Sequence, residues 1–471
     1  MSAMDLHDIQ GLVFSGYKAQ RLARYFFLRF GGGDARAFLG EILNRVSSAA
    51  PDEHEEARRL NVALTTSGLR ALGLEEDAVA TFPRELQQGM AHPERSLTLG
   101  DVGADAPEHW QLGRPGAGLD AVVFCYGRTE DELDEETELL ETTLERHRVV
   151  AETEDAYLPP DGREHFGFAD ARTNPRLSRF SLRPDENPFD PRVPLGEMVL
   201  GYRNARGVRP ARPTAPAKQS TRELPRPLDG GRLMDLGRNG SFVALRKLEQ
   251  DVPGFLHFVR EHGEVAYPGA PDPARHLAAA IVGRWQNGTS LVLAPDGEPA
   301  VANPSNRFGY QAHDELGRRC PFGAHARRAN PRDQLGGDPH ESLLRMRSHR
   351  LVRRGRLYGP RYEESAPTVE PRGLFFLALC ASLSGQFELV QESLLESTKA
   401  PGVYRERDPL VGRTEDVAAA PSSGGARRPE PFTIPAEPYA RTVPIRRFVR
   451  VRGGAYLFLP GLRALAYLAE P

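Results

Sequence analysis

The sequence has few of the features that would assign a chain to a class at once. Its only cysteines, Cys125, Cys320 and Cys380, are odd in number and far apart, which excludes a disulfide framework and a CxxC metal site. No stretch approaches the ~20 uninterrupted apolar residues that a membrane span requires. Residues 1–30 are broken up by charged side chains and lack a secretory signal. We therefore expect a cytoplasmic protein with reduced cysteines and no membrane contact.

An excess of charge of one sign is also lacking. The 61 Lys and Arg residues nearly balance the 64 Asp and Glu residues, which gives a net charge of −3. Such a chain has no strong field that would attract a polyanion. We therefore expect no nucleic-acid partner.

Length and composition indicate a large globular protein. The 471 residues are too many for one ordinary core, so the chain should form two or three domains or one duplicated unit. Hydrophobic residues at 39% and charged residues at 27% are typical of soluble folds, and 46 Gly with 40 Pro indicate many turns and ordered loops. A chain of this size can bury a cofactor.

Strand-like apolar runs alternate with amphipathic helical patterns in both halves of the chain, which favours sheets packed against helices. In the first half the expected order is strand 24–30, helix 34–46, strand 119–127, helix 129–147 and strand 149–158. In the second half it is strand 241–248, helix 251–262, strand 374–381 and helix 384–397. The acidic run in the helix at 129–147 predicts a solvated face and no metal site, because its carboxylates are spread around the helix.

A Pro-rich basic stretch separates the halves. Residues 206–230 read as a linker or a surface excursion, which predicts an N-terminal domain at 1–205 and a C-terminal domain at 231–471. Residues 411–437 are similarly rich in Pro, Ala, Gly and Ser and are expected to form a loop.

The first polar cluster is EHFGFADARTNP at 164–175. Asp170 lies there among Phe166, Gly167, Phe168 and Ala169, and apolar surroundings raise a carboxyl pKa and suit it to proton transfer. The alternative is an Asp that caps a turn.

The second cluster is centred on His325. The small residues Gly323 and Ala324 precede it, so its ring could reach a flat ligand such as haem, and histidine is a usual ligand of haem iron. Negative charge nearby could be neutralised by Arg327, Arg328 and Arg332. The alternative is a core histidine beside solvated arginines. His313, His340 and His349 form no HxxxH or HExxH pair with it, so a zinc site is poorly supported.

The third cluster, SHRLVRRGRLYGPRYEE at 348–364, contains Arg353 and Arg354 at the end of a short apolar pair. An arginine in a dry pocket supplies fixed charge and directed donors where negative charge develops on an oxygen. The alternative is a pair of surface arginines at a strand end.

Together the clusters resemble the dye-decolorizing (DyP-type) peroxidases over nearly the whole chain, in the family's order. GFADA at 167–171 matches the family's GxxDG except at its last position, and CPFGAHARRANPRD at 320–333 is similar to the proximal segment. Further similar runs stand at 9–30, 196–207, 240–251, 372–391 and 448–460. The resemblance implies an α+β fold of duplicated ferredoxin-like halves, with haem bound mainly by the C-terminal half.

The resemblance also implies roles for particular residues. His325 stands where the family has its ligand to the iron of haem b, Asp170 where it has the distal acid-base, and Arg353 where it has the distal arginine. Arg354 replaces Arg353 if the register differs by one. The residues expected to contact the cofactor are His325, Gly167, Ala171, Thr173, Arg353, Leu374 and Phe376. Glu388 is a candidate partner for His325, with a surface-facing Glu388 as the alternative.

The implied function is an enzyme that reduces hydrogen peroxide and oxidises phenolic, dye-like or porphyrin substrates in one-electron steps. Its partners would be peroxide and a small organic reductant, with self-association left open. One departure matters: Ala171 replaces the motif's last Gly, and a positive φ there would cost alanine on the order of 1 kcal/mol. Because of Ala171, an alternative function is a haem carrier or sensor that turns over little peroxide. A porphyrinogen oxidase is another.

Overall fold

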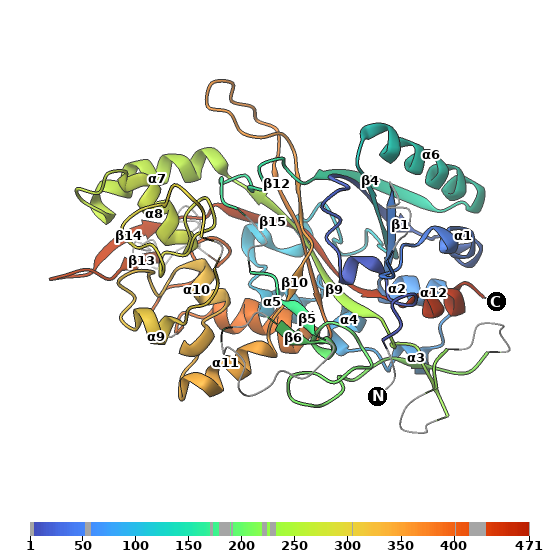
Figure 1. Ribbon diagram of the computed structural model, residues 1–471. Helices are drawn as coiled ribbons and strands as arrows, with labels where there is room; N and C mark the ends of the chain where they lie inside the picture. Colours follow the sequence, from blue (N-terminus) through green and yellow to red (C-terminus); the bar gives the residue numbers. More distant parts are fainter. Residues whose placement is uncertain are drawn as a thin grey trace, which may run out of the picture.

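The computed structural model describes residues 4–51, 58–169, 173–178, 189, 192–218, 224–226, 232–303, 305–400, 402–413 and 430–470. Long antiparallel strands cross the centre of the molecule, and helices cover them on both sides (Figure 1). The strands form one nine-stranded sheet, whose two halves, the first and the second sheet, have the same topology.

The first sheet contains the three strands expected in the first half and one, β2 (Arg59–Leu64), that was not expected. Its other strands are β1 (Leu22–Arg29), β3 (Ala121–Gly127) and β4 (Val150–Tyr157), and its main helices are α1 (Ala35–Ile42) and α6 (Glu130–His147). The strands lie in the order β4–β1–β3–β2, with antiparallel neighbours throughout. Asp34 and Thr129 cap the two helices by accepting backbone N–H groups. The order strand–helix–strand–strand–helix–strand is that of a ferredoxin-like unit.

The second sheet repeats this arrangement. Its strands are β9 (Ser241–Gln250), β10 (Val352–Arg353), β11 (Arg356–Tyr358), β12 (Gly373–Cys380) and β15 (Val449–Leu459), and α7 (Val252–Ala266) follows the first of them. β15 and β12 flank β9, and the broken strand β10/β11 lies on the far side of β12. We count β10 and β11 as one strand and number the strands of each sheet 1 to 4 along the chain. Both sheets then have the spatial order 4-1-3-2. The expected α+β fold of duplicated ferredoxin-like halves is confirmed.

The two sheets meet at their edges. Phe458 of β15 pairs with Leu64 of β2, and Leu357 of β11 pairs with Tyr157 of β4. The eight positions therefore form a closed ring, in which each half completes the other.

Two expectations for the second half were wrong in detail. In place of a regular helix at 384–397, the chain forms two π-helical segments, Leu383–Glu388 and Val390–Leu395. The expected loop at 411–437 contains a strand, β13 (Glu430–Ile434), which pairs with β14 (Arg441–Ile445). Residues 414–429 lie outside the described part of the chain.

The remaining elements are short. The helices are α2 (Thr66–Ala71), α3 (Glu76–Val79), α4 (Arg84–Gln88), α5 (Pro93–Leu99), α8 (Pro273–Val282), α9 (Tyr310–Asp314), α10 (His325–Ala329), α11 (Pro339–Arg347) and α12 (Leu462–Ala469). The strand pairs are β5 (Arg176–Ser178) with β6 (Arg192–Pro194) and β7 (Thr214–Ala215) with β8 (Met234–Asp235). The predicted domain boundaries at 205 and 231 stay a prediction.

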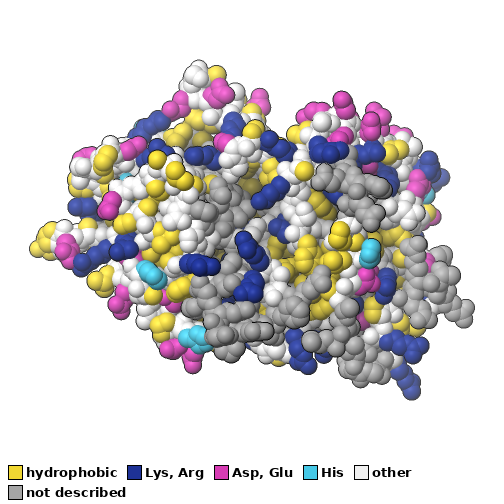
Figure 2. Space-filling view, in the orientation of Figure 1, with side chains coloured by type: hydrophobic (Ala, Val, Ile, Leu, Met, Phe, Trp, Pro, Cys, Tyr) yellow, Lys and Arg dark blue, Asp and Glu magenta, His cyan; other side chains and the backbone are white. Residues whose placement is uncertain are grey.

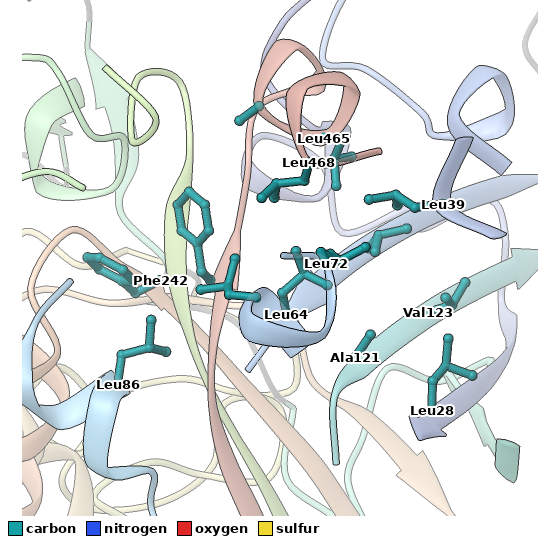
Figure 3. Close-up of a cluster of buried hydrophobic side chains, with 14 of the residues drawn as sticks. Leu28, Leu39, Leu64, Leu72, Leu86, Ala121, Val123, Phe242, Leu465 and Leu468 are labelled. Atoms are coloured by element: carbon teal, nitrogen blue, oxygen red, sulfur yellow. The ribbon is translucent and has the colours of Figure 1, made fainter. Parts of the chain in front are cut away.

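The C-terminal helix α12 belongs to the core of the first half. Leu465 and Leu468 of α12 point toward Leu39 of α1 and Leu72, in one buried cluster (Figure 3). Leu465 has no exposed surface. Helix α12 therefore packs on α1 and on Leu72, which both belong to the first half.

The surface carries charges of both signs, and acidic side chains gather over α6 (Figure 2). The inner stripe of that helix, Leu133, Leu140 and Leu144, is buried as expected. Within the described residues, no group of His, Cys, Asp and Glu side chains is placed to hold a metal ion, and no helix could cross a membrane. All three cysteines are buried and free of disulfides.

Candidate active site

A cavity of about 330 Å³ lies between the second sheet and the helices that cover it. That volume is within the range of small-molecule and cofactor sites. One wall comes from the sheet and another from α10. The sheet contributes Arg246, Leu248, Gln250, Leu374, Phe376, Val449 and Val451.

His325, the first residue of α10, lines this cavity, and a buried carboxylate holds its ring. Nδ1 of His325 lies 2.9 Å from Oδ2 of Asp408, whose side chain is fully buried. Burial alone would raise the pKa of the Asp408 carboxyl, but the charge and hydrogen bond of His325 and the nearby Arg328 cation bring it below its ordinary value. An ionised Asp408 accepts the Nδ1 proton, so Nε2 is the ring nitrogen left to bind a ligand.

Leu374 and Phe376 both face the cavity from β12, as strand alternation predicts. Phe166 and Phe168 also line it. These side chains give the pocket an apolar surface that suits a flat hydrophobic ligand.

Strand geometry distinguishes the two arginines of the third cluster. Arg353 lines the cavity, and its Nη2 donates to Oγ1 of Thr173 over 3.0 Å. Arg354 turns the other way and donates to the carbonyls of Leu12 and Val13 over 2.8 and 2.9 Å. Arg353 is therefore the residue available to a bound ligand.

Four arginines in the cavity wall have no acidic partner among the described residues. Arg284, Arg332, Arg350 and Arg353 donate to carbonyl, amide or hydroxyl oxygens and form no ion pair there. Burial, together with nearby arginines, lowers the pKa of Arg284 to about 10 and that of Arg350 to about 9. Positive charge without a counter-ion favours a ligand that carries anionic groups.

The first polar cluster is described only in part. Ala169 and Thr173 line the cavity, whereas Asp170 and Ala171, between them, lie outside the described residues. Gly167 does not line the cavity; its φ of +94° lets the chain turn between Phe166 and Phe168.

The prediction that Glu388 is the partner of His325 was wrong, and so was the alternative that Glu388 faces the surface. It is buried, accepts a hydrogen bond from the Tyr456 hydroxyl at 2.7 Å and pairs with Arg95 at 2.9 Å. Asp408 occupies the place that Glu388 was expected to fill.

No protein-family model matches the chain. The dye-decolorizing peroxidase msp1 of Mycetinis scorodonius is 27% identical over 98% of this chain and 87% of its own length. The multifunctional dye peroxidase DyP2 of an Amycolatopsis strain is 28% identical over 99% of this chain and 96% of its own length. A solved structure of a mutant decolorizing peroxidase from Auricularia auricula-judae has a TM-score of 0.79 and 24% identity, and the match covers 100% of both chains. Over nearly its whole length, the chain therefore resembles the dye-decolorizing peroxidases in sequence and in fold.

A dye-decolorizing peroxidase depends on haem, and the described residues of this cavity fit that group. His325 offers Nε2 to an iron, with its ring fixed by Asp408. The apolar side chains suit the macrocycle, and Arg284, Arg332 and Arg350 suit the carboxylate groups at its edge. The fit rests on the anchored imidazole, on the apolar side chains and on arginines that form no ion pair among the described residues.

Sequence reasoning missed Asp408, Arg284 and Arg350. Asp408 lies 83 residues from His325, and its only local signal is a carboxylate in an apolar turn, DPLVG. Of the three arginines named beside His325, only Arg332 lines the cavity, while Arg327 and Arg328 point into the protein around α10.

Proposed function

We propose that this protein reduces hydrogen peroxide and oxidises phenolic or dye-like molecules by one-electron steps, with haem b bound through His325. Its resemblance to the dye-decolorizing peroxidases, which extends over nearly the whole chain, supports the reaction. The single observation that supports the site is one cavity lined by an Asp408-anchored imidazole and by Arg353. Cytoplasmic location and self-association stay predictions of the sequence.

Several residues would hold the cofactor. Nε2 of His325 would bind the iron, and Asp408 would keep the imidazole oriented and electron-rich. Arg284, Arg332 and Arg350 would neutralise the porphyrin carboxylates. When bound, haem supplies the two electrons that reduce peroxide.

The other residues would manage protons and charge. Asp170 would take the proton from one peroxide oxygen and deliver it to the other, which leaves as water. Ala169 and Thr173, on either side of the segment that contains Asp170, both line the cavity, which supports this role. Arg353 would bind peroxide and stabilise negative charge on the departing oxygen through its fixed N–H donors. Leu374 and Phe376 would exclude water from the reacting atoms.

The test is an absorption spectrum of the haem-loaded protein before and after one equivalent of peroxide, followed by 2,6-dimethoxyphenol. We expect the Soret band to change with peroxide and to return as the phenol is oxidised. Asp170→Asn should take up haem equally and slow the first change by roughly 10²- to 10⁴-fold. His325→Ala should alter the Soret band before any peroxide is added.

Two results would contradict the proposal. Stoichiometric haem uptake without oxidation of the phenol at any pH from acidic to neutral would indicate a haem carrier or sensor. A normal spectrum in His325→Ala would assign the iron to another ligand.

A further inference from the structure

Helix α10 carries a buried arginine one turn after His325. Arg328 is 3% exposed, and its guanidinium donates to three backbone carbonyls: Leu395 at 3.1 Å, Ser397 at 2.6 Å and Glu406 at 3.2 Å. An arginine that donates to several backbone carbonyls of one distant segment links two parts of the chain.

The tied segment is the one that brings Asp408 to His325. The backbone N–H of Asp408 donates to the Leu395 carbonyl at 2.9 Å, so Arg328 and Asp408 share that oxygen as an acceptor. Glu406, whose carbonyl Arg328 also binds, lies two residues before Asp408. Loss of the Arg328 hydrogen bonds would therefore release the backbone that carries the Asp408 carboxylate.

Charge reinforces this arrangement. Asp408 is completely buried, and a buried carboxylate needs a counter-charge. An imidazole that binds a metal through Nε2 while keeping its Nδ1 proton is neutral, so His325 would not supply that charge in the loaded protein. The Arg328 cation acts on Asp408 in either state.

We propose that Arg328 is the positioning residue that holds Asp408 on Nδ1 of His325, and that it thereby sets how much electron density the imidazole gives to the iron. This inference rests on the proposed function, because it requires His325 to be the axial ligand. A strong hydrogen bond to Nδ1 makes the imidazole a better donor and stabilises ferric over ferrous iron. Loosening of that bond should raise the reduction potential.

The adjacent residue provides a matched control. Arg327 is 2% exposed and belongs to the same helix, but it pairs with Asp314 at 2.9 Å and donates to the Cys320 carbonyl at 2.6 Å. Its other hydrogen bonds go to Asp314 and Gln334, outside residues 395–408. Arg327→Lys and Arg328→Lys therefore disturb one helix equally, keep its charge, and differ in whether they release Asp408.

The experiment measures the Fe(III)/Fe(II) midpoint potential and the ferrous iron–histidine stretching frequency of the haem-loaded wild type and both lysine variants. We expect Arg328→Lys to shift the ferric/ferrous equilibrium about tenfold toward ferrous iron, a rise of ~59 mV for one electron, and to lower the stretching frequency. Arg327→Lys should change neither. In an Asp408→Asn background, Arg328→Lys should have no further effect, because the residue through which it acts has been removed.

The outcomes separate this inference from the proposed function. If the wild type shows no iron–histidine stretch, the proposed function fails, and the inference fails with it. If the stretch is present but Arg328→Lys matches Arg327→Lys, or if its shift persists beside Asp408→Asn, the inference is overturned and the function stands. Arg328→Gln supplies the same test by the stretching frequency if the lysine variant does not fold.

Discussion

Nη2 of Arg353 donates to Oγ1 of Thr173 over 3.0 Å, so a residue of the first half orients the cavity-facing arginine of the second. Asn174 adds to this contact, since its Oδ1 accepts the Arg353 backbone N–H at 3.0 Å and its Nδ2 donates to the Arg353 carbonyl at 3.0 Å. The guanidinium is therefore fixed before any ligand binds, which is the condition under which a donor lowers a reaction barrier most.

The first prediction concerns this arginine. Arg353→Lys keeps the charge but loses the fixed fork of donors, so we expect kcat/KM for peroxide to fall by roughly 10²- to 10³-fold while haem content is unchanged. Thr173→Val leaves the guanidinium in place without its anchor and should cost less. The measurement is peroxide-dependent oxidation of a phenol per bound haem. Equal kcat/KM values in wild type and Arg353→Lys would remove Arg353 from the reaction.

The second prediction concerns the cluster of cations without counter-ions. Removal of the Arg350 charge by Arg350→Met should relieve repulsion with Arg332 and Arg353 in the haem-free protein and raise its free energy of unfolding by about 1 kcal/mol. The same change should weaken haem retention by roughly tenfold, since one counter-charge for the porphyrin carboxylates is lost. Urea unfolding of the haem-free protein and haem transfer to an acceptor protein measure the two effects. A variant that is less stable but retains haem normally would contradict this assignment.

The third prediction concerns Glu396, which lines the cavity with 12% of its side chain exposed. Burial raises its pKa to about 7, although the Arg413 N–H and the Arg407 cation oppose the shift. The folded protein therefore binds this proton more tightly than the unfolded chain. The stabilisation is fully present below the unfolded pKa of about 4.5 and is lost as the pH rises through 7.

In urea unfolding, the wild type should therefore lose about 2 kcal/mol more than Glu396→Gln between pH 5 and pH 8. The exposed Glu392, on the same segment, provides the control variant Glu392→Gln, which should behave as the wild type does. Parallel pH profiles for wild type and Glu396→Gln would refute the raised pKa.

The fourth prediction concerns the C-terminal helix. Leu465→Ala removes a fully buried side chain between α12 and α1 and should lower the free energy of unfolding by roughly 2–5 kcal/mol. Leu139→Ala, at a position that is 52% exposed on α6, should change it by less than about 0.5 kcal/mol. Chemical denaturation of both variants tests this, and equal costs would place α12 outside the cooperative core.

The sequence predicted β3 and β12 well because burial on both faces leaves a strong local signal, whereas β2 and β15 were not predicted. The run AVVFCYG of β3 is buried at every position, and LFFLALC of β12 lies between two neighbouring strands. The residues that line the cavity from β12, Leu374 and Phe376, followed directly from strand alternation.

The hydrogen-bond partner of His325, Asp408, could not be predicted in the same way. Hydrogen bonding between His325 and Asp408 depends on how two segments 83 residues apart pack, and neither segment carries a periodic pattern that brings them together. Glu388 was plausible because it lies on a helix near the pocket. It contacts Tyr456 and Arg95 instead, and it lies in a π-helical turn in place of the regular helix that was expected.

The ring formed by the two sheets has a consequence for association. An open sheet ends in strands whose N–H and C=O groups can template a strand from another molecule. Among the described residues, the outer strands of each sheet meet those of the other, at Phe458 with Leu64 and at Leu357 with Tyr157. Addition of a strand to this ring would first have to separate the two halves, and the cavity, which residues of both halves line, would be lost with them.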